Sequence, residues 1–588
     1  MTDEPSTLID MLRAAASRVG DTRGIRFYES PKTSEFVGYD ELDGRSRRIA
    51  TALAQRGLAP GDSVVLALHP GLEFIEAVYG ALYAGLSVVP APVGGIAVSD
   101  VATEQVTNIV RASGSRAVLT HEAVTDLLSA EAGSTALADA AGVPVATISD
   151  LFAQGDADSW KAPVLNADSM AGMLFTSGST GNPKGVIMTH GSLLACSSLC
   201  QGLLDMTTDS VFVGWAPLHH AMGLIVQAFL PVYAAADAVL TSTAQFQRRP
   251  VFWLQLMSRH HATISVAGNF AFDLCTQFAT DEQISELDLS SLTALMTGSE
   301  PVRTDTVRRF VERFAPSGVR ESMIMPAMGM TEAMLISAKS LGTDLVIVNA
   351  DSSLLEGGTL REGSGAQTTE MVSCGPAAPL CNIVIIDPEQ DTPVALAENQ
   401  VGEIWITSPG ASPGYWQNPE ATAEVFGWKV PGDDRDYVRT GDLGALVDGE
   451  LFVTGRLKDL IIIRGRNLYP QDLEASARLA HAAVGIGAAF ELTGHPSDVG
   501  IVLEIDDAQL TEAGIDLVSL TTEVRAALIS RYSLPSLAVA FIGEGTLPRT
   551  PSGKVKRSLT RSKLDNGELS IVHADGFAPL LQATDGAG

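Results

Sequence analysis

The chain has 588 residues, of which 46% are hydrophobic and 18% charged, and its formal net charge is −30. This length allows more than one domain and a large core, and the composition is that of a globular rather than a disordered protein. The negative charge argues against nonspecific binding to nucleic acid.

Secretion and membrane insertion are not expected. The chain has five cysteines, and no histidine lies at metal-ligand spacing near Cys196 and Cys200, so we expect free thiols in a reducing compartment. The acidic N-terminus lacks an apolar signal region. The most apolar later stretch, Gly223 to Leu240, is interrupted by polar residues and a proline, so no membrane-spanning helix is predicted. The sequence predicts a soluble cytoplasmic protein.

Apolar strands alternate with helices along the first 300 residues. In chain order we expect an amphipathic helix from Ile9, a strand at Ile25–Tyr28, a helix at Tyr39–Arg56, a strand at Ser63–Leu68, a helix at Leu72–Ala84, and strands at Ser87–Pro90, Ala117–Thr120, Val211–Ala216, Ala262–Val266 and Ala294–Thr297. Such alternation predicts parallel sheets in a layered α/β fold.

The pattern changes near Val384 to shorter β-rich segments, which predict a small barrel or a twisted sheet. They are Cys381–Asp387, Gly402–Thr407 and Glu450–Val453. After Gly455 follow a strand at Leu460–Ile463, a helix at Pro470–His481 and further α+β elements. We therefore predict a large N-terminal domain, residues 1–457, and a small C-terminal domain, residues 458–588, with a loose tail after Asn566.

A loop dense in hydroxyl groups and glycines follows the apolar strand end at Met173–Phe175. It reads Thr176-Ser177-Gly178-Ser179-Thr180-Gly181-Asn182-Pro183-Lys184. Glycines let backbone N–H groups turn toward an anion, the hydroxyls add donors, and Lys184 adds a positive charge, so a polyphosphate is the expected ligand. The motif is not a Walker A loop, because Gly185 follows the lysine. Taken alone, a flexible surface loop is an equal alternative.

Four further segments follow in order. They are Gly298-Ser299-Glu300-Pro301, Met328-Gly329-Met330-Thr331-Glu332, Thr440-Gly441-Asp442-Leu443-Gly444 in an expected tight turn, and Pro548-Arg549-Thr550-Pro551-Ser552-Gly553-Lys554. With the Thr176–Lys184 loop they resemble the adenylate-forming superfamily of acyl-CoA synthetases, adenylation domains and luciferases. The likeness runs from about Thr7 to Arg561. The match is specific because five motifs occur in the same order, whereas any one motif alone would be weak evidence for the superfamily.

Within that superfamily the chain is most similar to fatty acyl-AMP ligases. The similar segments are Trp215–Leu224, Asn269–Cys275 and Gly455–Asp472. The polar piece Asp351–Thr369 lies where those enzymes carry an extra segment that hinders the domain rearrangement needed for coenzyme A. Two positions depart from the pattern: Ala221 replaces an aspartate, and Met328 replaces an aromatic residue that stacks near the adenine.

The resemblance implies that a fatty acid carboxylate attacks the α-phosphate of ATP and expels pyrophosphate. It needs no general base, since a carboxyl group is ionised at neutral pH. Lys554 would offset charge in the transition state, Thr331 would donate to the α-phosphate, and Glu332 would hold Mg²⁺, or be a carboxylate at a helix N-terminus. The other nucleotide-binding residues would be Thr176, Ser177, Gly178, Ser179, Thr180, Gly181, Lys184, Gly298, Ser299, Glu300, Met328, Gly329, Met330, Asp442 and Arg456.

The resemblance also assigns residues to the acyl pocket and to a hinge. His220, Met222, Gly223, Asn269, Phe270 and Phe272 would line the approach to the acyl tunnel, although two phenylalanines at this spacing are more often plain core. Lys458 would be the swivel of a mobile C-terminal domain, or an ordinary linker residue. Arg456 would reach the ribose or the phosphates, or would form an interdomain ion pair. Asp442 would accept hydrogen bonds from the ribose hydroxyls, or would simply be an aspartate in a turn.

The acyl group would then pass to the phosphopantetheine thiol of an acyl carrier protein, as in polyketide, lipid or lipopeptide synthesis. The first alternative is a fatty acyl-CoA ligase; an amino-acid adenylation domain and a catalytically dead sensor rank lower. The run from Arg549 to Lys563 contains six basic and no acidic residues. It is expected either to contact an acidic carrier protein or to be a solvated basic face.

Overall fold

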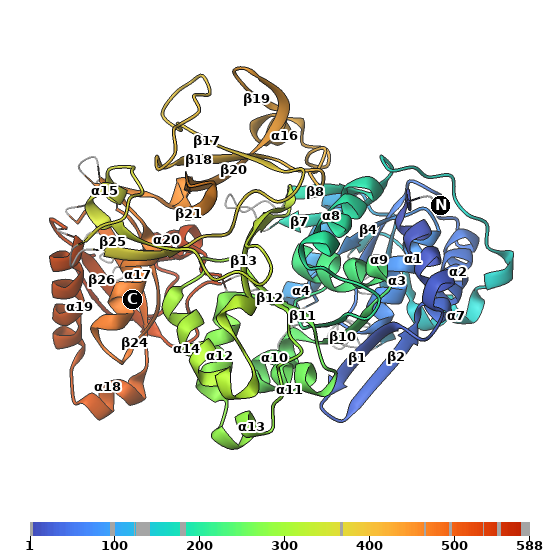
Figure 1. The fold of residues 1–588 in the computed structure, drawn as a ribbon, viewed down its shortest axis with the longest axis horizontal. Helices are drawn as coiled ribbons and strands as arrows, with labels where there is room; N and C mark the ends of the chain where they lie inside the picture. The colour runs from blue at the N-terminus through green and yellow to red at the C-terminus, as the bar shows by residue number, and fades with distance from the viewer. Residues whose placement is uncertain are drawn as a thin grey trace, which may run out of the picture.

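A computed structural model describes most of the chain. The described residues are 4–93, 100–122, 124, 141–176, 184–364, 368–463, 466–492, 495, 497–532, 534–549 and 554–577. Within them several sheets stack with helices in layers, which confirms the predicted α/β class (Figure 1). No helix in these ranges is long and apolar enough to cross a membrane.

The first sheet has six strands, all parallel except for the closing β7–β8 hairpin. Their spatial order is β6 (Val145–Thr147), β5 (Ala117–Thr120), β3 (Ser63–Ala67), β4 (Ser87–Pro90), β7 (Met170–Thr176) and β8 (Lys184–Thr189). The strands are continuous apolar runs because both faces of the sheet are covered. The predicted phosphate loop connects β7 to β8, and its residues 177–183 lie outside the described ranges.

The second sheet has eight strands and is parallel in its centre. Their order is β14 (Met334–Ala338), β13 (Ile324–Met330), β12 (Ala294–Thr297), β11 (Ile264–Ala267), β9 (Val211–Gly214), β10 (Asp237–Thr241), β1 (Gly24–Ser30) and β2 (Thr33–Gly38). Antiparallel hairpins form both edges, β13–β14 and β1–β2. The second strand of the β1–β2 hairpin was not predicted, because Phe36 and Val37 follow a polar stretch and half of the strand's residues are exposed.

Helices cover both faces of the two sheets. The shared inner layer comprises α1 (Leu8–Val19), α2 (Tyr39–Gln55), α3 (Leu72–Tyr83), α8 (His190–Leu203), the π-helix η2 (Met222–Phe229) and α9 (Leu230–Ala234). The outer layers comprise α4 (Asp100–Ser113) on the first sheet and α10 (Thr243–Arg248), α11 (Val251–Arg259), α12 (Asn269–Phe278) and α14 (Thr304–Phe314) on the second. Short elements between them are α7 (Ile148–Gln154), α13 (Asp281–Ser285) and the 3₁₀ turns η1 (Ala157–Ser159), η3 (Ala315–Ser317) and η4 (Glu321–Met323).

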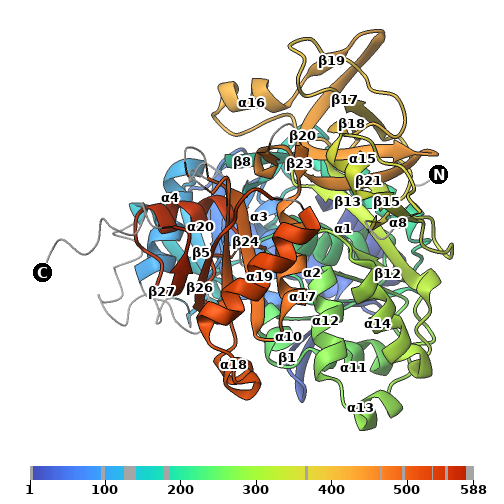
Figure 2. The ribbon, with the colours of Figure 1, turned by 90° about the vertical axis from the view of Figure 1, so that its left-hand side faces the viewer.

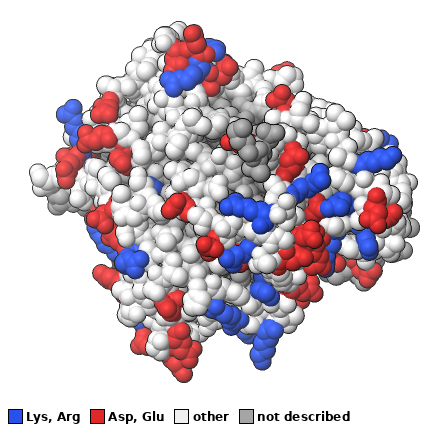
Figure 3. Space-filling model, turned by 45° about the vertical axis from the view of Figure 1, so that its right-hand side comes forward, with Lys and Arg blue, Asp and Glu red and all other residues white. Residues whose placement is uncertain are grey.

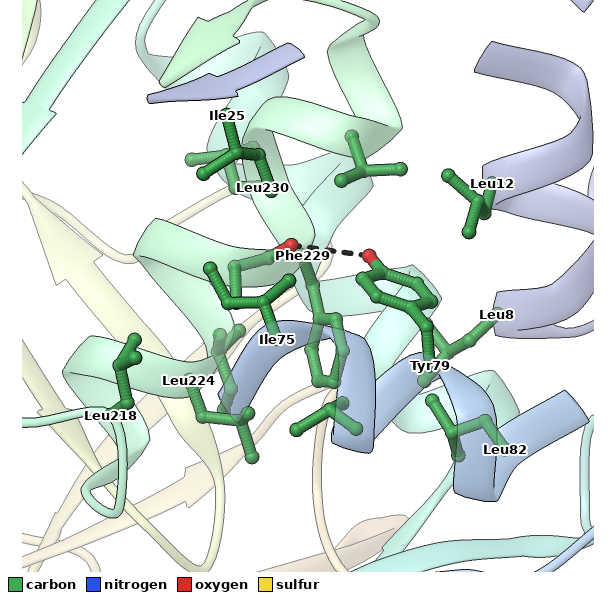
Figure 4. Packing of buried hydrophobic residues seen from close by; sticks show 14 of the residues in the cluster. Leu8, Leu12, Ile25, Ile75, Tyr79, Leu82, Leu218, Leu224, Phe229 and Leu230 are labelled. Atoms are coloured by element: carbon green, nitrogen blue, oxygen red, sulfur yellow. Dashed lines mark hydrogen bonds between the residues drawn. The ribbon is translucent and has the colours of Figure 1, made fainter. Parts of the chain in front are cut away.

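The largest core lies in the inner layer, between the two sheets. Figure 4 shows Leu8 and Leu12 of α1, Tyr79 of α3 and Phe229 of η2 converging there. The Tyr79 hydroxyl donates to the carbonyl of Ala228 at 3.1 Å, which satisfies a polar group in an otherwise apolar region. This packing makes the two sheets one rigid platform for the loops at their edges.

A smaller antiparallel sheet lies at the top of Figure 1. Its strands are β17 (Asn382–Ile386), β18 (Gly402–Thr407), β20 (Asp433–Val447), β19 (Trp428–Val430) and β21 (Glu450–Arg456), accompanied by α16 (Pro419–Val425). In the described ranges its outer strands β17 and β21 do not pair with each other, so of the two predicted forms it is a sheet and not a barrel. The extra segment predicted at Asp351–Thr369 contributes to a separate hairpin, β15 (Ile347–Asp351), α15 (Ser352–Glu356) and β16 (Thr368–Val372).

The C-terminal elements form a separate α+β body, on the left of Figure 1 and facing the viewer in Figure 2. It contains η5 (Leu457–Asp459), β22 (Ile461–Ile463), β23 (Arg466–Leu468), α17 (Pro470–Ala480), α18 (Asp507–Ala513), α19 (Leu517–Tyr532), α20 (Arg557–Asp565) and a sheet of β24 (Val484–Glu491), β25 (Val499–Ile505), β26 (Ala538–Gly543) and β27 (Ile571–Asp575). The prediction of a loose tail after Asn566 is wrong as far as β27, which pairs with β26; residues 578–588 lie outside the described part.

Candidate active site

The structure brings Lys554 from the C-terminal elements to the side chains predicted for nucleotide binding. Burial lowers the pKa of Lys554, and the nearby Arg456 lowers it further, whereas Glu300 and Asp442 act in the opposite direction. The charge of Lys554 also affects the pKa values of Glu300, Asp442 and His220. Lys554 thus lies within electrostatic reach of two carboxylates predicted to belong to the site, where an anionic ligand would sit.

Asp442 and Arg456 lie opposite each other on two neighbouring strands of the small sheet. They are paired residues of β20 and β21, and Arg456 Nε lies 3.1 Å from Asp442 Oδ1. Burial raises the pKa of Asp442, and Arg456 and Lys554 oppose that shift. The prediction of a tight turn at Thr440–Gly444 is wrong: the segment lies within the long strand β20, where a register shift after Leu443 bends the ladder.

Glu300 is held by backbone rather than by another charge. Its Oε1 accepts from the Phe270 N–H at 2.8 Å, at the start of α12. Burial raises the pKa of Glu300, and this hydrogen bond and Lys554 partly offset the shift. Ser299 has a positive φ of 67°, and a Cβ on Gly298 would lie 2.4 Å from the carbonyl of Ala327. The turn after β12 therefore requires a glycine for the chain to pass this close to β13.

Glu332 lies in the turn between β13 and β14. The alternative that places it at a helix N-terminus is therefore wrong. Glu332 Oε1 accepts from the Tyr415 hydroxyl at 2.9 Å, and Lys184 Nζ lies 5.1 Å from the centre of the same tyrosine ring. Lys184 begins β8, where it pairs with Thr176 of β7. Lys184, at one end of the predicted phosphate loop, thus lies near the tyrosine that contacts Glu332. The other predicted ligands in this loop lie outside the described residues; they are Ser177, Gly178, Ser179, Thr180 and Gly181.

The donor set around Glu332 suits a magnesium ion bound together with phosphates. Mg²⁺ typically takes one or two protein carboxylates and completes its shell with phosphate oxygens and water. Among the described residues no three His, Cys, Asp or Glu side chains gather into an all-protein metal site. Glu332 supplies one carboxylate, and its Oε2 makes no hydrogen bond with another described residue. The site fits a cation that arrives with its nucleotide.

Met328, Gly329, Met330 and Thr331 run from the end of β13 into the same turn. Met328 is buried and packs with Ile336 and Ile404 between the second sheet and the small sheet. It therefore presents a thioether where a stacking aromatic was expected from the family pattern.

The predicted acyl-pocket residues divide into two groups. His220, Met222 and Gly223 lie at the start of η2, where a Cβ on Gly223 would lie 2.0 Å from the carbonyl of Pro217. Phe270 is half-buried, and its ring meets that of Trp215 edge to face at 5.8 Å. Phe272 is fully buried and stacks on Phe310 at 4.6 Å. This packing favours the core alternative for Phe272.

Two polar residues flank this region, the half-buried His220 and the buried Asn269. Burial lowers the pKa of His220 to about 4, and the charges of Lys554 and His219 lower it further, so the imidazole is neutral at pH 7. Its Nδ1 accepts from the Met222 N–H at 3.4 Å. Asn269 Oδ1 accepts from the Arg303 N–H at 3.2 Å and so connects α12 to the turn before α14. The neutral His220 therefore adds no positive charge beside Lys554 and Arg456.

Lys458 lies in η5, next to a network of ion pairs. Burial lowers the pKa of Lys458, and Arg456 and Lys184 contribute in the same direction. The neighbouring Asp459 pairs with Arg557 at 3.2 Å, and Arg557 also contacts both carboxylate oxygens of Glu474 at 2.6 and 2.7 Å. The hinge candidate thus adjoins the helix that follows Lys554.

Most of the basic run Arg549–Lys563 is paired inside the molecule. Arg549 pairs with Glu504, Arg561 lies 3.8 Å from Asp565, and Lys563 lies 4.0 Å from Glu568. Arg557 is held as described above. The basic run is therefore not one free cationic face, and Arg557 is unsuited to contact a partner. In Figure 3 acidic and basic side chains are likewise interspersed on the visible surface.

Sequence reasoning missed two contacts of this region. Tyr415 was assigned no role. It follows the Ser-Pro-Gly segment Ser412–Gly414, in which the Ser412 N–H donates to the carbonyl of Glu332, and its own hydroxyl donates to the Glu332 carboxylate. Glu356 of α15 pairs with Arg466 of β23 through contacts of 2.7 and 2.8 Å. Only the family likeness of the extra segment could have drawn attention to Glu356, because its partner lies 110 residues away.

This site, at the edges of stacked α/β sheets and completed by a lysine from the C-terminal body, defines an adenylate-forming enzyme. Residues 12–416 match the family described as AMP-binding enzyme, and the chain belongs to that family. It is 33% identical to the medium-chain-fatty-acid–[acyl-carrier-protein] ligase JamA of Moorena producens, over 96% of each chain. It is 34% identical to the long-chain-fatty-acid–AMP ligase FadD26 of Mycobacterium marinum, over 89% of this chain and 91% of the relative.

Solved structures agree with this assignment. A structure from work on the fatty acyl-adenylate ligases of E. coli and L. pneumophila superposes with a TM-score of 0.85 at 28% identity, covering 96% of this chain and 98% of the other. The L. pneumophila ligase in complex with acyl adenylate and pyrophosphate superposes with a TM-score of 0.73 at 30% identity, over 97% and 98%. The predicted resemblance to fatty acyl-AMP ligases is confirmed at the level of the family.

Proposed function

We propose that the chain is a fatty acyl-AMP ligase. It joins a fatty acid to AMP with release of pyrophosphate and then transfers the acyl group to the phosphopantetheine thiol of an acyl carrier protein. The observation that carries the proposal is the position of Lys554 beside Glu300 and Asp442. The names of the relatives, a fatty acid–carrier-protein ligase and a fatty acid–AMP ligase, support the choice of substrate and acceptor.

The chemistry requires positioning and charge neutralisation, because the attacking carboxylate is already ionised. Lys554 offsets the negative charge shared by the carboxylate and the α-phosphate as they approach. Asp442 accepts from the ribose hydroxyls, with Arg456 fixing its orientation. Thr331 donates to the α-phosphate, and Lys184 binds the outer phosphates. Ser299, Glu300 and Met328 shape the adenine slot.

Glu332 is the residue proposed to hold Mg²⁺. The cation, when bound with ATP, would neutralise charge on the phosphates that leave as pyrophosphate. The carboxylate contributes one oxygen ligand, and Tyr415 fixes its other oxygen.

Two domains that meet at Lys458 suit a reaction with two half-steps. The proposed domains are residues 1–457 and 458–588, and in the described ranges no sheet combines strands from both sides of Lys458. The electrostatic influence of Glu300 and Asp442 on Lys554 supports an arrangement suited to adenylate formation. Rotation about Lys458 would then remove Lys554 and admit the acceptor thiol. Five free thiols fit a reducing cytoplasm as the place of action.

The extra segment is proposed to restrain this rotation. Glu356 of α15 pairs with Arg466, and Leu355 and Leu360 of the segment share an apolar cluster with Tyr469. If the ion pair restrains rotation, replacing Glu356 by alanine is expected to raise the yield of acyl-CoA relative to acyl-carrier thioester about fivefold. That corresponds to about 1 kcal/mol for one partly buried, hydrogen-bonded pair. Mass spectrometry of the products measures the ratio.

Arg308→Ala is the matched control for this change. It breaks a pair of similar geometry, Arg308–Glu370 at 2.8 Å, which joins β16 to α14 and not to the C-terminal elements. An unchanged product ratio in Glu356→Ala, or an equal rise in both variants, would contradict a role for Glu356 in acceptor choice.

A product assay tests the proposed function directly. Purified protein, ATP, Mg²⁺ and fatty acids of several lengths are divided among no acceptor, coenzyme A and a phosphopantetheinylated carrier protein. We expect acyl-adenylate without acceptor, acyl-carrier thioester with the carrier protein, and little acyl-CoA. Abundant acyl-CoA would assign the chain to the acyl-CoA ligases, and absence of adenylate with every fatty acid would overturn the substrate class.

A further inference from the structure

Tyr415 lies between the two charged residues of the phosphate region. Its ring centre is 5.1 Å from Lys184 Nζ, and its hydroxyl donates to Glu332 Oε1 at 2.9 Å. The residue is 8% exposed. Burial raises the pKa of Tyr415, and Glu332 raises it further, so the phenol keeps its proton and remains a donor.

The backbone around Tyr415 connects the Glu332 turn to strand β8. The Ser412 N–H donates to the carbonyl of Glu332 at 2.8 Å. Further along, the Trp416 N–H donates to the carbonyl of Gly185 at 2.7 Å, and the Ile187 N–H donates to the carbonyl of Gly414 at 3.1 Å. Residues 412–416 therefore form a short strap between the two elements. The place of the tyrosine ring is set by these backbone bonds.

The tyrosine separates charges that would otherwise neutralise each other. Among the described residues Lys184 and Glu332 make no ion pair with each other within 4.0 Å. The ring face attracts the ammonium group, and the hydroxyl at the other end of the side chain donates to the carboxylate. Each charged group is thus oriented by a neutral side chain, so its charge stays available for a ligand.

We infer that Tyr415 is a positioning residue that holds Lys184 and Glu332 apart and aims both at the triphosphate and its divalent cation. The inference rests on the proposed function, which gives Lys184 the phosphates and Glu332 the Mg²⁺. Without the hydroxyl, Glu332 loses the donor that sets its direction toward the cation. Without the ring as well, Lys184 is free to form an ion pair with Glu332, and that pair competes with the phosphates.

Two substitutions separate the two contacts of Tyr415. Tyr415→Phe keeps the ring beside Lys184 and removes the donor to Glu332. Calorimetric titration of ATP at increasing Mg²⁺ is expected to show that the enhancement of ATP affinity by Mg²⁺ falls about tenfold, whereas affinity for ATP without Mg²⁺ stays unchanged. Tyr415→Leu removes the ring as well, so affinity for ATP is expected to fall also without Mg²⁺.

Tyr437→Phe is the control for losing a buried tyrosine hydroxyl. That hydroxyl donates to Asp433 Oδ2 at 2.7 Å and accepts from Asn382 Nδ2 at 2.7 Å, within the small sheet. The inference is overturned if Tyr415→Phe binds ATP with the Mg²⁺ dependence of the unmodified protein, or if Tyr437→Phe changes that dependence equally. The titration contains no fatty acid, so it remains informative even if the product assay refutes the proposed substrate.

Discussion

Replacing Lys554 by alanine is expected to lower fatty-acid-dependent ATP–pyrophosphate exchange by about 100- to 1,000-fold. This is the usual loss when one preorganised charge donor is removed from a transition state. The lysine belongs to the C-terminal elements, and its charge acts on the pKa values of Glu300 and Asp442. Its removal leaves those two carboxylates without a counter-charge from that side. We therefore expect the rate of adenylate formation to fall while binding of the fatty acid is largely kept.

Lys556→Ala serves as the control, because Lys556 lies two residues further along and its hydrogen bonds to described residues, with Pro548 and Thr560, are made by its backbone and not by its side chain. It should retain exchange activity within a factor of about two, as surface substitutions usually do. Exchange by Lys554→Ala at the unmodified rate would exclude Lys554 from the chemistry. A second readout is transfer from a preformed acyl-adenylate to the carrier protein, which the domain-rotation proposal predicts to survive in Lys554→Ala.

The layered sheets could be predicted because their signal is local. Val64 to Leu66 and Val88 to Val89 are buried on both faces of a parallel sheet, and such strands appear as continuous apolar runs between helices. The glycine-rich loop and the motif that ends in Lys554 are also local sequences. Their order along the chain indicated the family before any contact was known.

The partners of the site residues could not be predicted, since they depend on contacts between distant segments. Arg557 was interpreted as a candidate for partner docking, yet Glu474, 83 residues earlier, holds it in place. Asp442 was expected in a turn, because Thr-Gly-Asp sequences are common in turns, but cross-strand pairing with Arg456 overrides that preference. Tyr415 has no local signal, since one of its partners begins β8 of the first sheet and the other lies in the turn between β13 and β14.

Reversing the charge of Arg557 is expected to destabilise the C-terminal body by about 3–5 kcal/mol, the usual cost of breaking a buried ion pair. The Arg557 side chain is 20% exposed and those of Glu474 and Asp459 are 10% and 14% exposed. Arg557→Glu would place a third carboxylate among two buried ones. Thermal unfolding followed by calorimetry should then show a C-terminal transition at lower temperature. Adenylate formation should be lost as well, because the ion pairs of Arg557 hold the start of α20, three residues after Lys554.

Two further variants distinguish a structural role of Arg557 from a role in docking. Lys556→Glu is expected to leave unfolding unchanged, and if the basic run contacts an acidic carrier protein, it weakens acyl transfer without slowing adenylate formation. Combining Arg557→Met with Glu474→Gln removes both charges of the pair and keeps an acceptor for the Ala489 N–H, now 3.0 Å from Glu474. This double variant should recover much of the stability lost in Arg557→Glu, because it removes the charge of Glu474 together with that of Arg557 and leaves only Asp459 without its partner. An Arg557→Glu protein that unfolds like the unmodified one but fails only in acyl transfer would instead assign Arg557 to the carrier-protein contact.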